Sequence, residues 1–256
     1  MVKAIFFDID GTLLSHRSGT VPASARAALL RLKERGILLF AATGRHILEL
    51  EKLPVRDLPF DGYATLNGQI CLDGHKTLLY SAPIPPEDAQ QLAAAFAARE
   101  VPMMIVEAER IYVNFINDAV RAAQRAISTP VPEIGVYTGA PMYQFDVYAD
   151  EAHLPPLIAQ LPHCKASRWN PYAIDIMPRS GGKVAGIRRI LEHFHLTPQE
   201  IMAFGDGEND LDMLRCAGIG VAMGNADEAV KQSADHVTAG VDQDGIREAL
   251  AFFGLI

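Results

Sequence analysis

The stretch AIFFDIDGTLL, residues 4 to 14, constrains the fold of this chain more than any other feature. Four apolar residues run without a break into Asp8 and Asp10, and Gly11 follows at once. A continuous apolar run that ends in polar residues and glycine is typical of a strand buried on both faces of a parallel sheet. Carboxylates crowded at the end of such a strand repel each other and lose water, so they need a cation or a reaction that uses them. The stretch therefore predicts a functional site at the end of a buried strand.

The same pattern of strand and polar turn returns along the chain. A helical pattern over about 22 to 35 stops at Gly36, and the strand and turn GILLFAATGR follow it. Near the C-terminus a helix is expected over 183 to 195, followed by the strand and turn EIMAFGDGEND. Strand, helix and strand in succession indicate a right-handed crossover and an α/β core with a doubly wound, Rossmann-like parallel sheet.

The middle of the chain has a different order of predicted helices and strands. Residues 84 to 178 read as helix, strand pair, helix, two strands, helix and a last strand pair, which is typical of an α+β unit with its own sheet. Proline flanks this block at positions 83, 85 and 86, and residues 178 to 182 close it with proline and glycine. We therefore expect a core domain built from residues 1–83 and 179–256, with an inserted domain over 84–178.

Composition limits the partners of this chain. It carries 49% hydrophobic and 21% charged residues, a net charge of -8 and no run of lysine or arginine, so neither nucleic acid nor an anionic membrane is an expected partner. The three cysteines, at 71, 164 and 216, have no metal-binding spacing and are expected to be reduced thiols. No stretch approaches membrane-spanning length, so the expected location is the cytoplasm.

Polar turns at three strand ends predict one shared site. In open α/β sheets, ligands bind where the carboxyl ends of the strands meet. Four acids collected there favour Mg²⁺, which prefers hard oxygen ligands and often shares its shell with a phosphate. Thr43, the Gly44 backbone and Lys183 are suited to bind an anion. The set indicates phosphoryl transfer and comprises Asp8, Asp10, Thr43, Gly44, Lys183, Asp206 and Asp210.

DIDGTLL, TGR, Lys183 and GDGEND, in this order, resemble the four motifs of the haloacid dehalogenase superfamily. The large insertion between the second and third motifs resembles the type IIB cap of that superfamily, a domain that selects the substrate. NGQI at residues 67 to 70 and DQDGIREAL near the end resemble its Cof-type branch. One departure is Val184, because members often have glycine directly after the motif lysine.

The resemblance implies roles for individual residues. Asp8 would be the nucleophile that forms an aspartyl phosphate, and Asp10 would act first as general acid and then as general base. Mg²⁺ would be held by the Asp8 carboxylate, the Asp10 backbone carbonyl and the Asp206 side chain. Thr43, the Gly44 backbone, Lys183 and Asn209 would bind the phosphoryl group, while Asp210 would orient the metal waters or Lys183.

Other residues have a functional and a structural interpretation. Arg45 is a candidate phosphate or substrate contact, but a structural ion pair explains it equally well. Asp210 is also suited to cap a helix. Arg168, Trp169 and Tyr172 in the last strand pair of the insertion are candidate substrate contacts, although packing of Trp169 is at least as good an explanation.

The sequence favours a cytosolic Mg²⁺-dependent phosphatase of a small phosphorylated metabolite, such as a sugar phosphate, pyridoxal phosphate or a flavin mononucleotide. One alternative is a phosphomutase of the same superfamily, although the insertion contains no dense arginine cluster for a second phosphate. The other is a signalling receiver that is phosphorylated on an aspartate without turnover. The identity of the metabolite and the oligomeric state are left open by the sequence.

Overall fold

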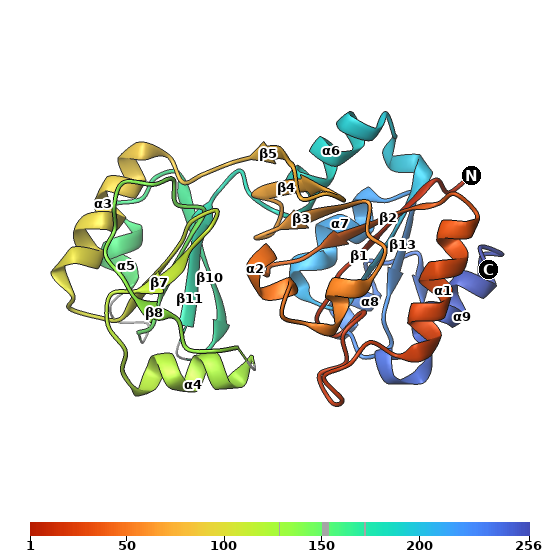
Figure 1. Cartoon of the computed structure of the whole chain (residues 1–256), viewed down its shortest axis with the longest axis horizontal. Coiled ribbons are helices and arrows are strands. Elements are labelled where there is room, and N and C mark those ends of the chain that lie inside the picture. Colours follow the sequence, from red (N-terminus) through yellow and green to blue (C-terminus); the bar gives the residue numbers. More distant parts are fainter. Residues whose placement is uncertain (128, 150–153, 172) are drawn as a thin grey trace. The chain divides into compact units, whose positions relative to one another are not determined.

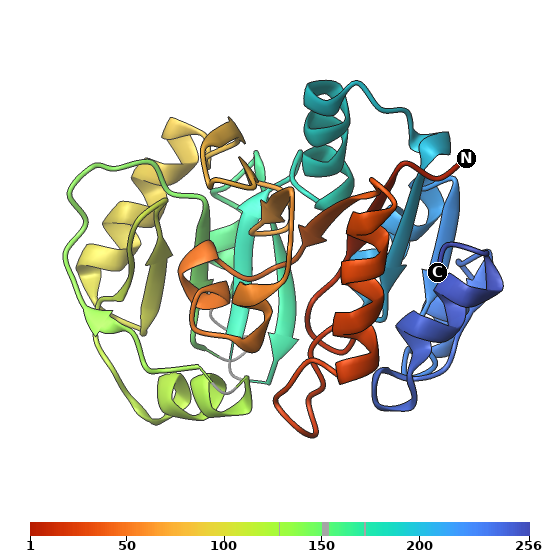
Figure 2. The ribbon, with the colours of Figure 1, turned by 45° about the vertical axis from the view of Figure 1, so that its right-hand side comes forward.

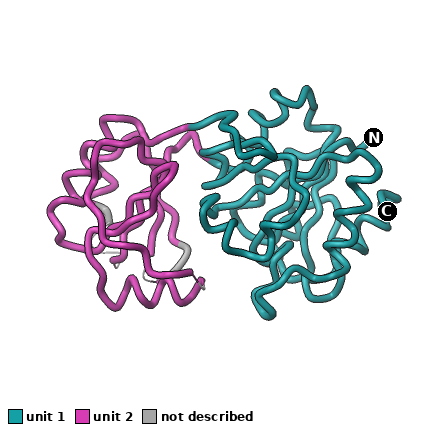
Figure 3. The backbone as a smooth tube through the Cα atoms, viewed as in Figure 1, with its two compact units in different colours: residues 1–81, 182–256 teal, residues 82–181 magenta. Residues whose placement is uncertain are grey.

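The computed structural model of the chain describes residues 1–127, 129–149, 154–171 and 173–256. It divides into two compact units, which Figure 3 colours separately. Residues 1–81 and 182–256 form the core unit, and residues 82–181 form the inserted unit. No helix in the described part of the chain is long and apolar enough to span a membrane.

The core unit contains an eight-stranded sheet in the order β14-β13-β12-β1-β2-β3-β4-β5 (Figure 1). The strands from β14 to β3 are parallel, as the sequence predicts, whereas β4 and β5 pair antiparallel. The strands are Ala4–Phe7 (β1), Leu38–Ala42 (β2), Gly62–Thr65 (β3), Ile70–Asp73 (β4), Leu78–Ser81 (β5), Ile201–Gly205 (β12), Ile219–Ala222 (β13) and His236–Val237 (β14). The helices are Ala23–Glu34 (α1), Ile47–Leu50 (α2), Lys183–Phe194 (α6), Leu211–Cys216 (α7), Glu228–Lys231 (α8) and Gly245–Phe252 (α9).

Strands β3, β4 and β5 form an antiparallel meander at one end of the sheet, which the expected parallel sheet did not include. The turn between β3 and β4 holds Leu66, Asn67 and Gly68 at positive φ angles of 49°, 52° and 83°. Asn-Gly is a strong hairpin signal because both residues tolerate this conformation, so the sequence did contain evidence for the turn. The hairpin carries Asn67 close to the turn that contains Gly44.

Alternating side chains of the central strand β1 are buried on both faces of the core sheet. Phe6 stacks on Phe40 at a centroid distance of 4.8 Å, within a cluster that includes residues of α6 and α7. Phe7 stacks on Phe204 at 5.2 Å. Helices α1 and α9 pack against each other, and both views show them side by side (Figures 1 and 2). Burial on both faces of the core sheet explains why β1 is apolar throughout.

The inserted unit has its own sheet of six strands, in the order β10-β11-β9-β6-β7-β8. Its pairs are antiparallel except β7 with β8. The strands are Met103–Val106 (β6), Ile111–Val113 (β7), Glu133–Ile134 (β8), Gln144–Val147 (β9), Cys164–Asn170 (β10) and Ala173–Pro178 (β11). The helices are Pro86–Ala98 (α3), Asp118–Ala126 (α4) and Leu154–Ile158 (α5). Leu92 and Phe96 of α3 join a separate hydrophobic cluster with Phe145 and Ile176, so this unit has a core of its own.

Candidate active site

The site is built where β1 meets its two parallel neighbours. Strand β1 lies between β12 and β2, and each of these neighbours ends in a polar turn. The Asp8 amide donates to the Phe204 carbonyl at 2.9 Å, so the pairing of β1 with β12 extends to the first acid. The sheet order therefore brings the turns of residues 8–12, 43–45 and 206–210 to one edge, as expected at a switch point.

Lys183 joins two of the acids. Its Nζ donates to Asp8 Oδ1 at 2.5 Å and to Asp210 Oδ1 at 2.6 Å, and all three side chains are buried. Burial alone would lower the pKa of Lys183, but Asp210 and Asp8 outweigh it and raise that pKa above the ordinary value. Helix α6 begins at Lys183 with Gly182 as its N-cap, so Val184 leaves the start of the helix intact.

Burial and the neighbouring acids act against ionisation of Asp8. Burial raises the pKa of the Asp8 carboxyl well above its usual range, and Asp210 adds to the rise, whereas the Lys183 ammonium opposes it. A carboxylate that is to act as a nucleophile must be ionised. Lys183, together with any cation bound nearby, favours the ionised form.

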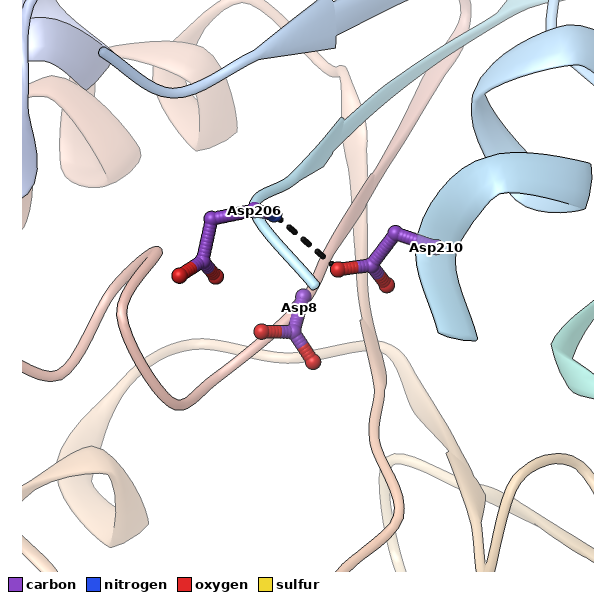
Figure 4. Close-up of side chains that lie close together, drawn as sticks. All are labelled: Asp8, Asp206 and Asp210. Carbon is purple, nitrogen blue, oxygen red and sulfur yellow. Dashed lines mark hydrogen bonds between the residues drawn. The ribbon is translucent and has the colours of Figure 1, made fainter. Parts of the chain in front are cut away.

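Asp210 acts within the turn that follows β12. Besides accepting from Lys183, it uses Oδ2 to accept the amides of Asp206 at 3.0 Å and Gly207 at 2.9 Å. Figure 4 shows the bond from the Asp206 amide to Asp210, and it shows the carboxylates of Asp8, Asp206 and Asp210 close together. Both oxygens of Asp210 therefore have partners, and the residue fastens Lys183 to the Asp206 turn.

Asp206 is held by uncharged donors. Thr12 Oγ1 donates to its Oδ1 at 2.9 Å, and Asn225 Nδ2 donates to its Oδ2 at 3.0 Å. Gly11, at φ +82°, passes so close that a Cβ atom there would lie 2.1 Å from Asp206 Oδ2, which explains the glycine. Burial raises the pKa of Asp206 to about 6; Asp210 adds to the rise, and the Thr12 bond opposes it.

The carboxylate of Asp10 points to Arg45. Arg45 Nε donates to Asp10 Oδ2 at 2.6 Å, and Arg45 Nη2 donates to Oδ1 at 2.7 Å. Burial lowers the pKa of Arg45, but the bond to Asp10 outweighs it and the net shift is upward. The sequence allowed Arg45 to be either a phosphate or substrate contact or a member of an ion pair, and the structure shows it in an ion pair with Asp10. Two of the four acids thus have a lysine between them and a third has an arginine, so the chain itself supplies cations for the crowded carboxylates.

The remaining predicted phosphate ligands gather around the β2 turn. Thr43 is buried, and its Oγ1 accepts the Arg45 amide at 3.1 Å. A Cβ atom on Gly44 would lie 3.3 Å from Asn67 Nδ2, so Asn67 covers this glycine. Asn209 Nδ2 donates to Asn67 Oδ1 at 3.1 Å, which connects the Asp206 turn to the β3–β4 hairpin.

Two of the candidate substrate contacts of the insertion, Arg168 and Trp169, belong to strand β10. Arg168 Nη1 donates to the Pro171 carbonyl at 3.0 Å, a local contact within the β10–β11 turn. Trp169 belongs to strand β10, but its side chain is outside the described part of the structure, as is the whole of Tyr172.

The sequence analysis missed Thr12 and Asn225 as partners of Asp206. Asn225 follows strand β13, the parallel neighbour of β12, so a fourth polar turn reaches the same edge of the sheet. Once the strand order is known, Asn225 can be identified as a neighbour of the Asp8 turn. Its Nδ2 also donates to the Gly11 carbonyl, across 214 positions of sequence.

The acids at this edge fit a divalent cation. Among the described residues, Asp8, Asp206 and Asp210 each offer a carboxylate oxygen, and the three oxygens lie within 4.8 Å of one another. Oxygen ligands of this kind suit Mg²⁺. Asp210 already accepts three hydrogen bonds, one of them from the Lys183 ammonium. Asp206 accepts from two uncharged donors, and Asp8 accepts from Lys183 on one oxygen, so Asp8 and Asp206 are the better ligands.

A buried acid beside a lysine at the switch point of a doubly wound sheet is the arrangement of a protein that handles phosphoryl groups. Residues 5–250 match the family of haloacid dehalogenase-like hydrolases, and the chain belongs to this family. It is 30% identical to the Bacillus subtilis protein YkrA over 99% of this chain and 98% of that one. It is 29% identical to the pyridoxal phosphate phosphatase YbhA of Escherichia coli, over 96% of each chain. Its fold matches the HAD subclass IIB sugar phosphatase BT4131 with a TM-score of 0.85 and 37% identity over all of both chains.

The family explains the architecture of both units. Structural relatives of subclass IIB combine the Rossmann-like core with an inserted cap, which confirms the expected fold class and the resemblance on which it was based. Membership in a hydrolase family argues against the receiver alternative, because a receiver does not turn over.

Proposed function

We propose that this protein is a Mg²⁺-dependent phosphatase that hydrolyses a small phosphorylated metabolite through an aspartyl phosphate on Asp8. The observation that carries the proposal is the buried contact of Lys183 Nζ with Asp8 Oδ1 and Asp210 Oδ1, at 2.5 and 2.6 Å. A fixed ammonium beside the nucleophile favours its ionised form and provides positive charge for an incoming phosphoryl group.

The first step forms a covalent bond to Asp8. The Asp8 oxygen that does not contact Lys183 attacks phosphorus while the bond from phosphorus to the ester oxygen breaks. Asp10 donates a proton to the departing alkoxide, so the alcohol leaves neutral. The backbone and hydroxyl donors of residues 43 and 44 are suited to the phosphoryl oxygens, together with Lys183.

The second step releases inorganic phosphate. Asp10, now a carboxylate, accepts a proton from water as the water oxygen attacks phosphorus. The bond from phosphorus to the Asp8 oxygen breaks, and Asp8 returns as a carboxylate. Bound Mg²⁺, held by Asp8, Asp206 and the Asp10 carbonyl, would supply positive charge to the phosphoryl oxygens and the crowded carboxylates.

We further propose that residues 84–178 select the substrate, as a cap does. Relatives that act on pyridoxal phosphate, on a phosphorylated ribitylaminouracil and on sugar phosphates support a small phosphorylated metabolite as the substrate class. A sugar phosphate or a phosphorylated cofactor such as pyridoxal phosphate or a flavin mononucleotide fits this class.

The test is a screen of the purified protein with Mg²⁺ against a panel of phosphate monoesters, with released inorganic phosphate as the readout. The Asp8→Asn variant is the control for contaminating phosphatases. We expect release from one or more small esters by the unaltered protein alone. Absence of release from every ester, or equal release by the control, would refute the proposal. Transfer to a second position of the same metabolite, with no net release, would instead identify a phosphomutase.

A further inference from the structure

Asp206 differs from the other three acids of the site in the charge of its partners. Lys183 forms ion pairs with both Asp8 and Asp210, and Arg45 forms one with Asp10. Among the described residues Asp206 forms no ion pair with a lysine or arginine; its two oxygens accept from the Thr12 hydroxyl and the Asn225 amide. Neutral donors orient a carboxylate without cancelling its charge, so the charge of Asp206 stays available to a cation.

Asn225 connects three separate segments of the core unit. Its Nδ2 donates to Asp206 Oδ2 at 3.0 Å and to the Gly11 carbonyl at 2.9 Å. Its Oδ1 accepts the Val241 amide at 2.9 Å. The side chain amide is therefore oriented on one side by the segment around Val241, and on the other side it fixes both Asp206 and the turn after Asp8.

The segment around Val241 is itself anchored to the chain that follows the Asp8 turn. Ser15 Oγ donates to Asp242 Oδ1 at 2.7 Å, and Ser24 Oγ donates to Asp244 Oδ1 at 2.5 Å. A cavity of about 330 Å³ borders Asn225 and this segment, and the Asn225 side chain is exposed to it. The orientation of the amide is therefore set by its hydrogen bonds rather than by close packing. These bonds span more than 200 positions of sequence and join the C-terminal stretch to the segment that follows Asp8.

We propose that Asn225 is a positioning residue for the divalent cation: its amide, oriented by the Val241 N–H, holds the Asp206 carboxylate in the direction from which it ligates the ion. This inference rests on the proposed function, because it takes Asp206 as a ligand of Mg²⁺. A hydroxyl could not serve in this place, because it has one proton, whereas the amide donates to both Asp206 and the Gly11 carbonyl while it accepts from Val241. A lysine in this place would neutralise the ligand.

The experiment measures Mg²⁺ binding directly, by titration calorimetry without substrate. Loss of a group that orients a ligand typically weakens metal binding about 10-fold to 100-fold. We expect this loss for Asn225→Ala, and also for Asn225→Ser, whose shorter side chain cannot span the contacts to both Val241 and Asp206. Gln243→Ala is the matched control, because Gln243 accepts the Gly240 amide in the same segment but does not contact Asp206.

The outcomes separate this inference from the function on which it rests. Weakened binding in both Asn225 variants, with binding retained in the control and thermal unfolding in chelator close to that of the unaltered protein, supports the role. Equal Mg²⁺ affinity in all four proteins overturns it and leaves the phosphatase proposal intact. Equal weakening in the control overturns it as well, since the whole segment rather than Asn225 would then be responsible. Absence of Mg²⁺ binding by the unaltered protein overturns both.

Discussion

The guanidinium of Arg45 holds both carboxylate oxygens of Asp10, with contacts of 2.6 and 2.7 Å. In this arrangement neither oxygen is free to donate a proton, because each accepts a hydrogen bond from the same planar group. If Asp10 is the general acid, at least one of these contacts has to open during the reaction. Arg45 therefore sets the orientation of Asp10 and also restrains it.

Arg45→Met should impair esters with poor leaving groups most. Without its bidentate partner the Asp10 carboxylate can rotate, and misorientation of a general acid can cost on the order of 100-fold. We expect kcat/KM, which reports the step that expels the leaving group, to fall about 100-fold with an alkyl phosphate. With p-nitrophenyl phosphate, whose leaving group needs no proton, kcat/KM should fall only about 10-fold. Arg45→Lys should be intermediate, since an ammonium cannot bind both oxygens in parallel. Equal losses with both substrates would show that Arg45 does not act through Asp10.

Replacement of Asp10 and of Asp8 by asparagine should have separable effects. Asp8→Asn removes the nucleophile and should stop turnover of every ester. Asp10→Asn should still let p-nitrophenyl phosphate phosphorylate Asp8, while hydrolysis of the aspartyl phosphate stays slow. Rapid mixing should then show a burst of p-nitrophenolate near one equivalent per enzyme, followed by a stall, with the phosphorylated protein detected by mass. Failure of both steps together, in a folded variant that binds Mg²⁺, would leave Asp10 a structural residue.

Lys183→Met should strongly destabilise the protein in the absence of metal. The variant leaves two buried carboxylates, Asp8 and Asp210, close together without their shared cation, and breaking a buried pair typically costs about 3–5 kcal/mol. Lys183→Met combined with Asp210→Asn should recover part of this loss, because one of the two like charges is gone. Urea unfolding in chelator measures the free energies. The control is Lys33→Met, whose partner Asp61 forms a more exposed ion pair, and it should lose only about 1 kcal/mol. Similar losses at positions 33 and 183 would contradict the burial argument.

Gly186→Ala should lower activity through Lys183, one turn earlier on the same helix. A Cβ atom on Gly186 would lie 2.5 Å from the Gly68 Cα atom, so helix α6 and the β3–β4 turn touch backbone to backbone. The added methyl must push α6 away, and overpacking costs about 1–3 kcal/mol, more than the gain in helix propensity of about 1 kcal/mol. Arg188→Ala, an exposed position of the same helix, is the control. Unchanged kcat and unfolding free energy in Gly186→Ala would mean that the contact is not needed to place Lys183.

Mg²⁺ should stabilise the protein more at pH 7.5 than at pH 5. Burial raises the pKa of Asp206 to about 6, above its value of about 4 in an unfolded chain. Between these values the folded protein holds a proton that the unfolded chain has lost, so this group lowers stability as pH rises from 4 to 6. Mg²⁺ needs the ionised carboxylate and has to displace that proton below pH 6. Melting temperatures with and without saturating Mg²⁺ test this expectation, and an equal gain at both pH values would contradict it.

The local pattern of the sequence determined the order and type of most elements and the chemical nature of the site. Strand β1 was predictable because burial on both faces of the sheet requires a continuous apolar run. Helix α1 was predictable because burial of one side of a helix leaves apolar residues at a helical period. The acids, Thr43 and Lys183 were identifiable because each follows a strand or begins a helix at a predictable edge.

Only the tertiary structure decided which partner each of these residues has. Asp10 is paired with Arg45 across 35 positions, Asp8 with Lys183 across 175, and Gly11 with Asn225 across 214. Such pairs depend on strand order and on turn geometry to within about an ångström, and hydrophobic periodicity carries no information about either. The sequence therefore predicts a phosphate-handling site rich in acids. The fold alone determines that Lys183 and Arg45 pair with three of those acids and that two neutral donors, from Thr12 and Asn225, bind the fourth.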